Sequence, residues 1–144
     1  MTFASVVRRI PHMSEPVTVK QLVAKTQAKL TGDESLIVTD VSHDSRRVGK
    51  GTLFAAVSGA LFDAHKFVPQ VMEQGAAGVL SEREVPDGFN GTWLQVADIR
   101  CAMALAAAEV QHHPSRELQL AGITGTNGKT TTAYLIASIP EHGD

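Results

Sequence analysis

Residues 117–139 read ELQLAGITGTNGKTTTAYLIASI, and this stretch decides the fold class. Its first part, ELQLAGIT, is mainly apolar, which is typical of a buried strand. A glycine-rich turn follows, and GKTTTAYLIASI then predicts a helix that Pro140 interrupts. A strand that leads through a short loop into a helix is the building unit of an α/β protein with a parallel sheet.

The turn in this stretch has the composition of a phosphate-binding loop. The backbone N–H groups and the dipole of a helix N-terminus favour an anion there. Lys129 is placed to reach the β- and γ-phosphates of ATP, and the Thr130 hydroxyl is placed to ligate Mg²⁺. The strict motif has a glycine where this chain has Ile123. The sequence therefore predicts a variant ATP loop; the alternative is a strand–turn–helix connection whose glycines serve only the turn.

Helical and strand patterns alternate along the rest of the chain. Thr18 and Gln21 form a capping-box pattern that predicts a helix, which ends at the turn LTGD. A second helix is expected to begin around Lys66, because Pro69 is tolerated only in a first turn, and to end at Gly75. Strands are predicted at 35–41, 52–59, 76–82 and 92–98, and a third helix at 99–113. This order predicts an α/β domain with a mostly parallel sheet.

Composition and charge limit the classes of partner. A chain of 144 residues predicts one compact domain and the start of a second. Thirteen basic and fifteen acidic residues leave a net charge of -2, which offers no electrostatic basis for a nucleic-acid or membrane partner. The single cysteine, Cys101, lies in an apolar helical pattern and is predicted to be buried. The absence of a disulfide framework fits a cytoplasmic protein.

Three histidines are candidates for metal ligands. His65, His112 and His113 have no acidic or cysteine companion at metal-ligand spacing, so no metal role is predicted for them. The pair before Pro114 is interpreted as an exposed helix end, where a cation suits the dipole.

Four stretches together resemble the Mur ligases, the ATP-dependent enzymes that extend the peptide of the peptidoglycan precursor. They are GITGTNGKTTT (122–132), DVSHDSRRVGKGTLFAAVSG (40–59), FDAHKFVPQVMEQGAAGVLSE (62–82) and the segment 96–132, and the resemblance runs from 17 to 139. It implies a loose extension at 1–15 and a UDP-sugar-binding domain with a mostly parallel sheet at 16–115. Residues 116–144 would be the first strand, P-loop and helix of a truncated ATP-binding domain. The segments that complete the enzyme would lie downstream, so the 144 residues alone are expected to be inactive.

Within the family, two substrate classes and one non-catalytic role remain open. The Thr-Asn pair of the loop and HHPSRELQL before it resemble the ligases that add meso-diaminopimelate or lysine to UDP-N-acetylmuramoyl-L-alanyl-D-glutamate. FDAHKF (62–67) also suits the ligases that add D-alanyl-D-alanine. A UDP-sugar-binding module without turnover is the third possibility.

The resemblance also implies roles for residues. ATP would be wrapped by the loop, with Lys129 and Thr130 catalytic and Thr130 on Mg²⁺. UDP-N-acetylmuramic acid (UDP-MurNAc) would be contacted by His43 and Ser45, with Asp44 and Arg46 shaping their loop, and the segment after Gly59 would line the uridine side. The alternative is that Asp44 and Ser45 make only turn hydrogen bonds and that Arg46 is a solvated charge. The full sets are Gly125, Thr126, Asn127, Gly128, Lys129, Thr130 and Thr131 for ATP, and His43, Ser45, Ala60, Leu61 and Phe62 for UDP-MurNAc.

Overall fold

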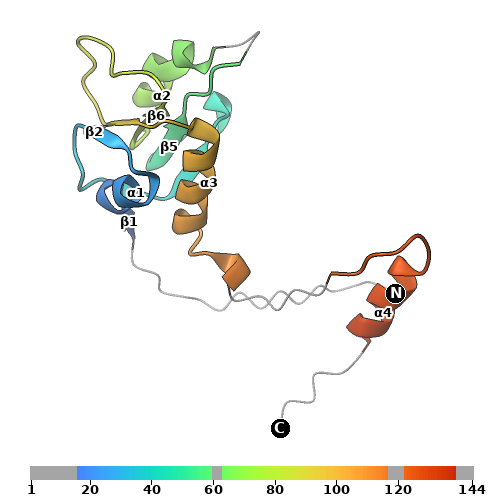
Figure 1. Cartoon of the computed structure of the whole chain (residues 1–144). Helices are drawn as coiled ribbons and strands as arrows, with labels where there is room; N and C mark the ends of the chain where they lie inside the picture. The colour runs from blue at the N-terminus through green and yellow to red at the C-terminus, as the bar shows by residue number, and fades with distance from the viewer. Residues whose placement is uncertain (1–15, 60–62, 117–121, 139–144) are drawn as a thin grey trace. The chain divides into compact units, whose positions relative to one another are not determined.

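The computed structural model describes residues 16–59, 63–116 and 122–138 of the chain. The chain divides into two compact units, Met1–Pro114 and Ser115–Asp144. The first unit carries the sheet, and the second carries the glycine-rich loop and the helix that follows it (Figure 1). None of the helices in these ranges combines the length and the apolar composition that crossing a bilayer requires.

The main sheet of the first unit has five strands in the order β2-β7-β6-β5-β4. The neighbours from β7 to β4 are parallel, and β2 is antiparallel to β7. The predicted mostly parallel sheet is therefore confirmed. The strands are β2 (Lys29–Thr31), β4 (Asp40–Ser42), β5 (Thr52–Ala55), β6 (Gly78–Ser81) and β7 (Trp93–Gln95).

Helices cover both faces of this sheet. Successive side chains of a strand point to opposite faces, so on β5 Leu53 and Ala55 join one core cluster and Phe54 joins another. The first cluster packs the sheet against α1 (Val19–Thr26) and α3 (Ile99–Val110), which lie side by side (Figure 1). The second packs the opposite face against α2 (Val68–Glu73).

The predicted helix signals are confirmed, with one shifted start. Thr18 and Gln21 form both hydrogen bonds of the capping box at the start of α1. Ahead of α2, a 3₁₀ turn, η2 (Ala64–Phe67), occupies the expected start, so the α-helix itself begins at Val68. Pro69 lies in the first turn, where its missing N–H costs no helical hydrogen bond. Gly75 adopts φ +90°, a conformation that glycine tolerates best.

One strand prediction and one turn prediction are wrong. The single strand expected at 35–41 is split into β3 (Ile37–Val38) and β4, which belong to different sheets. β3 pairs with β1 (Val17–Thr18), and Thr39 between β3 and β4 donates its N–H to the Gly51 carbonyl instead of joining either ladder. The turn expected at LTGD (30–33) is partly β2, a three-residue edge strand that pairs with β7. The hydrophobic pattern of β2 is weak because Lys29 and Thr31 are polar, and both are exposed.

The burial predicted for Cys101 is also wrong, because the side chain is exposed. The buried positions of α3 are Ile99, Ala102, Ala106 and Val110. These follow the three- and four-residue spacing of one helix face, and Cys101 lies off that face. The alanine-rich composition predicted the helix but did not show which face is buried.

The second unit contains one described α-helix, α4 (Lys129–Ala137), as predicted for this stretch. Of the strand expected at 117–124, residues 117–121 lie outside the described residues, and 122–124 are in no strand. Pro140, which was expected to interrupt the helix, also lies outside them. Tyr134, Leu135 and Ile136 of α4 are exposed, so this helix presents apolar side chains to solvent.

Candidate functional site

The loop after β4 is shaped by an aspartate–arginine pair. Asp44 accepts hydrogen bonds from the backbone N–H of Arg46 at 3.1 Å and from its guanidinium Nε and Nη2 at 2.9 and 2.8 Å. These bonds close a single 3₁₀ turn, η1 (Ser45–Arg47). The guanidinium first and the backbone N–H second lower the pKa of Asp44 to about 2. The loop therefore carries an ionised carboxylate that is already paired.

Replacing Arg46 by alanine is expected to raise the pKa of Asp44 from about 2 toward 3.8, because the largest stabilising contact of the carboxylate is lost. A lowered carboxyl pKa contributes stability that is present above the unfolded-state pKa and lost as pH falls through the folded-state value. The wild-type loop should therefore lose this contribution between about pH 4 and pH 2, whereas the R46A loop, with its folded-state pKa close to the unfolded value, should have little of it to lose. Carboxyl ¹³C NMR titration measures the pKa of Asp44 in the wild type and in R46A. Arg47→Ala is the control, since Arg47 is the smallest contributor to the shift; equal effects of the two changes would contradict the assignment.

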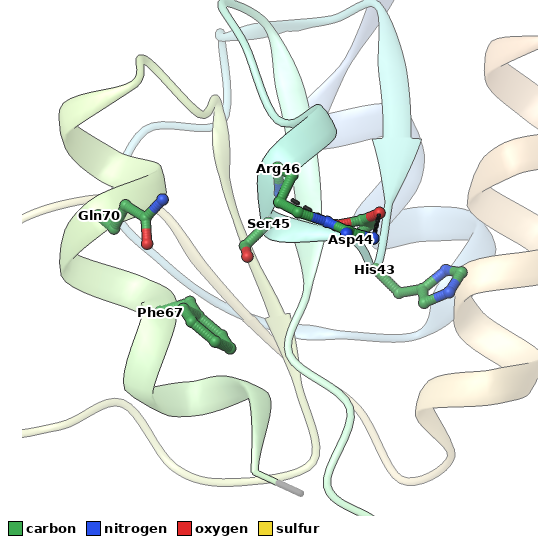
Figure 2. A pocket seen from close by; sticks show the side chains of 6 residues that line it. All are labelled: His43, Asp44, Ser45, Arg46, Phe67 and Gln70. Atoms are coloured by element: carbon green, nitrogen blue, oxygen red, sulfur yellow. Dashed lines mark hydrogen bonds and ion pairs between the residues drawn. The ribbon is translucent and has the colours of Figure 1, made fainter.

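A cavity of about 420 Å³ lies beside this loop (Figure 2). Ser45 projects from the loop toward the side chains of Phe67 and Gln70, which belong to η2 and α2. The ring of His43 points away from these two side chains. Ser45 thus points toward these two side chains and His43 does not, and the ligand roles of both residues stay predictions. The cavity is lined by His43, Asp44, Ser45, Arg46, Phe67 and Gln70.

Two residues of this lining, Phe67 and Gln70, were absent from the predicted ligand contacts. Phe67 packs partly against the second core cluster. The signal that could have identified the pair is their three-residue spacing, which places both on one side of a helical segment. Residues Ala60, Leu61 and Phe62 lie outside the described residues, so their ligand role stays a prediction.

The segment that leads into α2 is anchored to β6 by a hydrogen-bonded chain. Asp63 Oδ1 lies 2.7 Å from Nδ1 of His65, and His65 Nε2 lies 2.7 Å from the hydroxyl of Ser81 on β6. Arg83 adds an ion pair to Asp63 at 2.9 Å. Hydrogen bonds from the backbone and side chain of His65 are the largest causes that lower the pKa of Asp63 to about 2.

This chain of hydrogen bonds has the order of a serine–histidine–aspartate triad, but it lacks an accessible nucleophile. The side chain of Ser81 is fully buried, and its hydroxyl also accepts the backbone N–H of Arg83 at 2.9 Å. The arrangement therefore holds the η2 segment on the sheet. Within the described parts of the chain, no group of three or more His, Cys, Asp or Glu side chains is placed to hold a metal ion.

The second candidate site is the glycine-rich loop of the second unit. Gly128 immediately precedes α4 with φ +80°, and no side chain caps this helix end. The first N–H groups of an α-helix have no partner within the helix, so they are available to an anion. The Lys129 ammonium donates to the backbone carbonyls of Gly125 and Thr126 and thus lies over the loop. The loop and helix have the donors that a phosphate group requires; their contact with ATP stays a prediction.

Comparison with known proteins gives consistent results. No protein-family model matches the chain. It is 44% identical over 104 residues to the UDP-N-acetylmuramoyl-L-alanyl-D-glutamate–2,6-diaminopimelate ligase of Syntrophomonas wolfei, covering 72% of this chain and 21% of that protein. It is 40% identical over 121 residues to the Bacteroides fragilis protein of the same name, covering 81% and 24%.

A solved structure shares the fold. The UDP-N-acetylmuramoylalanyl-D-glutamyl-2,6-diaminopimelate–D-alanyl-D-alanyl ligase of Acinetobacter baumannii superposes with a TM-score of 0.64 at 32% identity, over 87% of this chain and 28% of that one. The chain thus spans about a fifth to a quarter of the length of the two curated relatives. The curated relatives and the solved structure are all Mur ligases, and together with the four matching stretches they show that this chain belongs to the Mur ligase family.

Proposed function

We propose that this chain contributes the sugar-nucleotide-binding domain, residues 16–115, and the ATP phosphate loop of a diamino-acid-adding ligase. The reaction joins meso-diaminopimelate or lysine to UDP-MurNAc-L-Ala-D-Glu in the cytoplasm. The observation that carries the proposal is the cavity beside Ser45. It lies after the carboxyl end of β4 in a mostly parallel sheet, which is where open α/β sheets bind their ligands. The names of the two curated relatives support the choice of substrate.

In the proposed reaction, a carboxylate oxygen of the UDP-dipeptide attacks the γ-phosphorus of ATP, giving an acyl-phosphate and ADP. The amine of the diamino acid then attacks the acyl carbon, phosphate leaves, and the nitrogen loses a proton to give the amide. The residues of this chain bind and orient: the Ser45 cavity holds the UDP-sugar, and the loop from Gly125 to Thr131 holds the phosphates. Lys129 would place its positive charge on the β- and γ-phosphates.

Mg²⁺ fits the same loop. The donor that this chain offers is the exposed hydroxyl of Thr130 in the first turn of α4, and a hydroxyl oxygen suits this hard cation. The ion would neutralise charge that develops on the phosphates. The proposed partners are thus small molecules, with neither nucleic acid nor membrane among them.

A second ligase activity is supported by a specific observation. The solved structure that shares the fold is named for the addition of D-alanyl-D-alanine, and FDAHKF also fits that class. Phosphate release by the intact protein distinguishes the two ligases. Stimulation by UDP-MurNAc-L-Ala-D-Glu with a diamino acid supports the first, and stimulation only by the UDP-tripeptide with D-alanyl-D-alanine supports the second. Binding of the UDP-sugar with no phosphate release from either pair would give this chain the role of a binding module, as expected if the 144 residues alone are inactive.

Replacing Ser45 by alanine is expected to weaken binding of UDP-MurNAc-L-Ala-D-Glu about tenfold, which is typical of one lost hydrogen bond to a polar or charged group. Within the described residues the Ser45 hydroxyl makes no hydrogen bond, so the change should leave the fold intact. Isothermal titration calorimetry of the full chain measures the affinity. Ser35→Ala, in a surface turn where Ser35 bonds to Asp33, is the matched control. Equal affinities of wild type and S45A would remove Ser45 from the site.

A further inference from the structure

Arg83 follows β6 and joins four parts of the first unit. Its backbone N–H donates to the Ser81 hydroxyl at 2.9 Å, and its carbonyl accepts from Nε1 of Trp93 at 3.0 Å. Its guanidinium lies 2.9 Å from Oδ2 of Asp63 through Nη1 and donates to the Ser58 hydroxyl at 3.1 Å through Nη2. Arg83 thus connects two strands of the sheet to Ser58 and Asp63, which form an isolated β-bridge with each other.

With the hydrogen bonds of His65, these contacts close a cycle. It runs from the N–H of Arg83 to Ser81, from Ser81 to Nε2 of His65, from Nδ1 of His65 to Oδ1 of Asp63, and from Oδ2 of Asp63 back to the Arg83 guanidinium. We call this set of four residues the Arg83 cycle. It begins and ends on one residue, so the loss of the guanidinium opens it.

The donors and acceptors of the Arg83 cycle determine where His65 carries its proton. Asp63 is ionised, because hydrogen bonds from the backbone and side chain of His65 are the largest causes that lower its pKa to about 2. A carboxylate only accepts, so Nδ1 of His65 is the donor. The hydroxyl of Ser81 is fully buried and already accepts from Arg83, and within the described part of the chain the acceptor for its own proton is Nε2 of His65. A proton on Nε2 would leave that buried hydroxyl without an acceptor, which is unfavourable.

The Arg83 cycle fixes the 3₁₀ turn beside the Ser45 cavity. His65 is the second residue of η2, and Phe67, which ends η2, lines the cavity. Asp63 also accepts the backbone N–H of His65 at 3.0 Å and so caps the turn. The four residues of the cycle are themselves outside the cavity lining. Their influence on a ligand therefore passes through the position of η2.

We propose that the Arg83 cycle positions η2 for ligand binding, with Arg83 as the residue that closes it and His65 held as its Nδ1–H tautomer. This inference rests on the proposed function, in which the cavity takes a UDP-sugar. When the cycle is closed, η2 is held in the arrangement that lines the cavity. Opening the cycle lowers the fraction of molecules in that arrangement, and the apparent affinity falls with that fraction.

Positioning can be separated from stability because the closing contact is partly exposed. The side chains of Arg83 and Asp63 are 54% and 45% accessible. Exposed ion pairs contribute little to the stability of a fold, so changes at this contact should leave the domain folded. Trp93 reports on this directly, because it is the single tryptophan of the chain, is buried, and donates to the Arg83 carbonyl.

The test uses three variants of the closing contact and one control. Arg83→Met removes the guanidinium, and Arg83→Lys keeps a cation that can reach Asp63 but not both partners of the planar fork. Asp63→Asn keeps the shape of the side chain and removes its charge. Arg100→Met is the matched control, because Arg100 is exposed on α3 and outside the cavity lining.

Isothermal titration calorimetry of the full chain with UDP-MurNAc-L-Ala-D-Glu measures the effect. R83M and D63N should each weaken binding about three- to fivefold, the range that a partly exposed ion pair allows. R83K should recover most of this loss, and R100M should bind as the wild type does. The double variant R83M/D63N should bind no more weakly than either single variant, because both open the same cycle. Trp93 fluorescence should remain that of a buried tryptophan in all of them.

The tautomer of His65 is tested without any ligand by ¹⁵N NMR of the full chain at slightly alkaline pH. Nδ1 is expected to show the chemical shift of a protonated ring nitrogen and Nε2 that of an unprotonated one. This is the reverse of the tautomer that free histidine prefers in water. A proton on Nε2 in the wild type would overturn the cycle.

The binding outcomes separate this inference from the proposed function. Wild-type affinity in R83M and D63N, or additive losses in the double variant, would overturn the positioning role, while S45A still decides whether the cavity binds the UDP-sugar. If the wild type does not bind UDP-MurNAc-L-Ala-D-Glu at millimolar concentration, the proposed function and the positioning role both fail. Should D63N prove unfolded by circular dichroism, the comparison of R83M with R83K decides, since the Arg83 side chain is exposed.

Discussion

Replacing Phe54 by alanine is expected to lower the free energy of unfolding of the first unit by about 3–5 kcal/mol, a typical loss for a phenylalanine removed from a core. Phe54 is fully buried on β5, an interior strand of the sheet, opposite Val79 of β6 and Ser42 of β4. Its ring belongs to the cluster that supports α2. Because native domains are stable by only about 5–15 kcal/mol, this single change removes a large fraction of the stability.

The measurement is urea unfolding followed by circular dichroism, with the midpoint expected to fall and the slope to stay constant. Leu53→Ala is the matched control, because Leu53 is equally buried but faces α1 and α3. Both variants should be destabilised, by about 2–5 kcal/mol for L53A. In conditions where both remain folded, only F54A should weaken UDP-sugar binding, since Phe54 belongs to the cluster that supports α2 and Phe67 beside the cavity. A loss below about 1 kcal/mol in F54A would contradict the burial of this ring.

Replacing Lys129 by methionine is expected to reduce the affinity of the chain for ATP by about 30-fold or more. A hydrogen bond to a charged group contributes about 1.5–3 kcal/mol, and each 1.4 kcal/mol corresponds to a factor of ten in affinity. Lys129 follows Gly128 directly and lies over the backbone carbonyls of the loop. Its charge is therefore already held where a phosphate would meet the N-terminus of α4.

Titration of the full chain with ATP, with and without Mg²⁺, measures this effect. Lys20→Met is the charge-matched control, because Lys20 forms an exposed ion pair with Glu34 in the first unit. Thr130→Ala should remove the part of the affinity that depends on Mg²⁺ and keep the part that does not. Wild-type ATP affinity in K129M would show that the glycines serve only the turn.

Much of the fold was predictable because its signals are local. The capping box of Thr18 and Gln21, the position of Pro69 and the stop at Gly75 act within one helical turn, and all three are found in the structure. The continuous apolar runs of β5 and β6 predict buried parallel strands because both faces of such strands are covered.

The errors have a common physical cause, which is dependence on distant partners. β2 exists because three residues pair with β7, more than sixty positions away. The separation of β3 from β4 depends on the pairing of β3 with β1 and on the bond from Thr39 to Gly51. Cys101 is exposed because the face of α3 that meets the sheet is set by α1 and the strands, and the helix composition does not reveal it.

By itself the sequence determined the fold class and the family and predicted a phosphate-binding role for the loop Gly125–Thr131, since each rests on residues adjacent in the chain. Tertiary structure alone brought Ser45 opposite Phe67 and Gln70, because the loop after β4 and the start of α2 meet only when β4, β5 and β6 are parallel neighbours. It also showed that Asp63, His65 and Ser81 form a structural chain, since the burial of Ser81 becomes visible only in the packed sheet. Local chemistry thus identified the kind of protein, and long-range packing decided which side chains share a site.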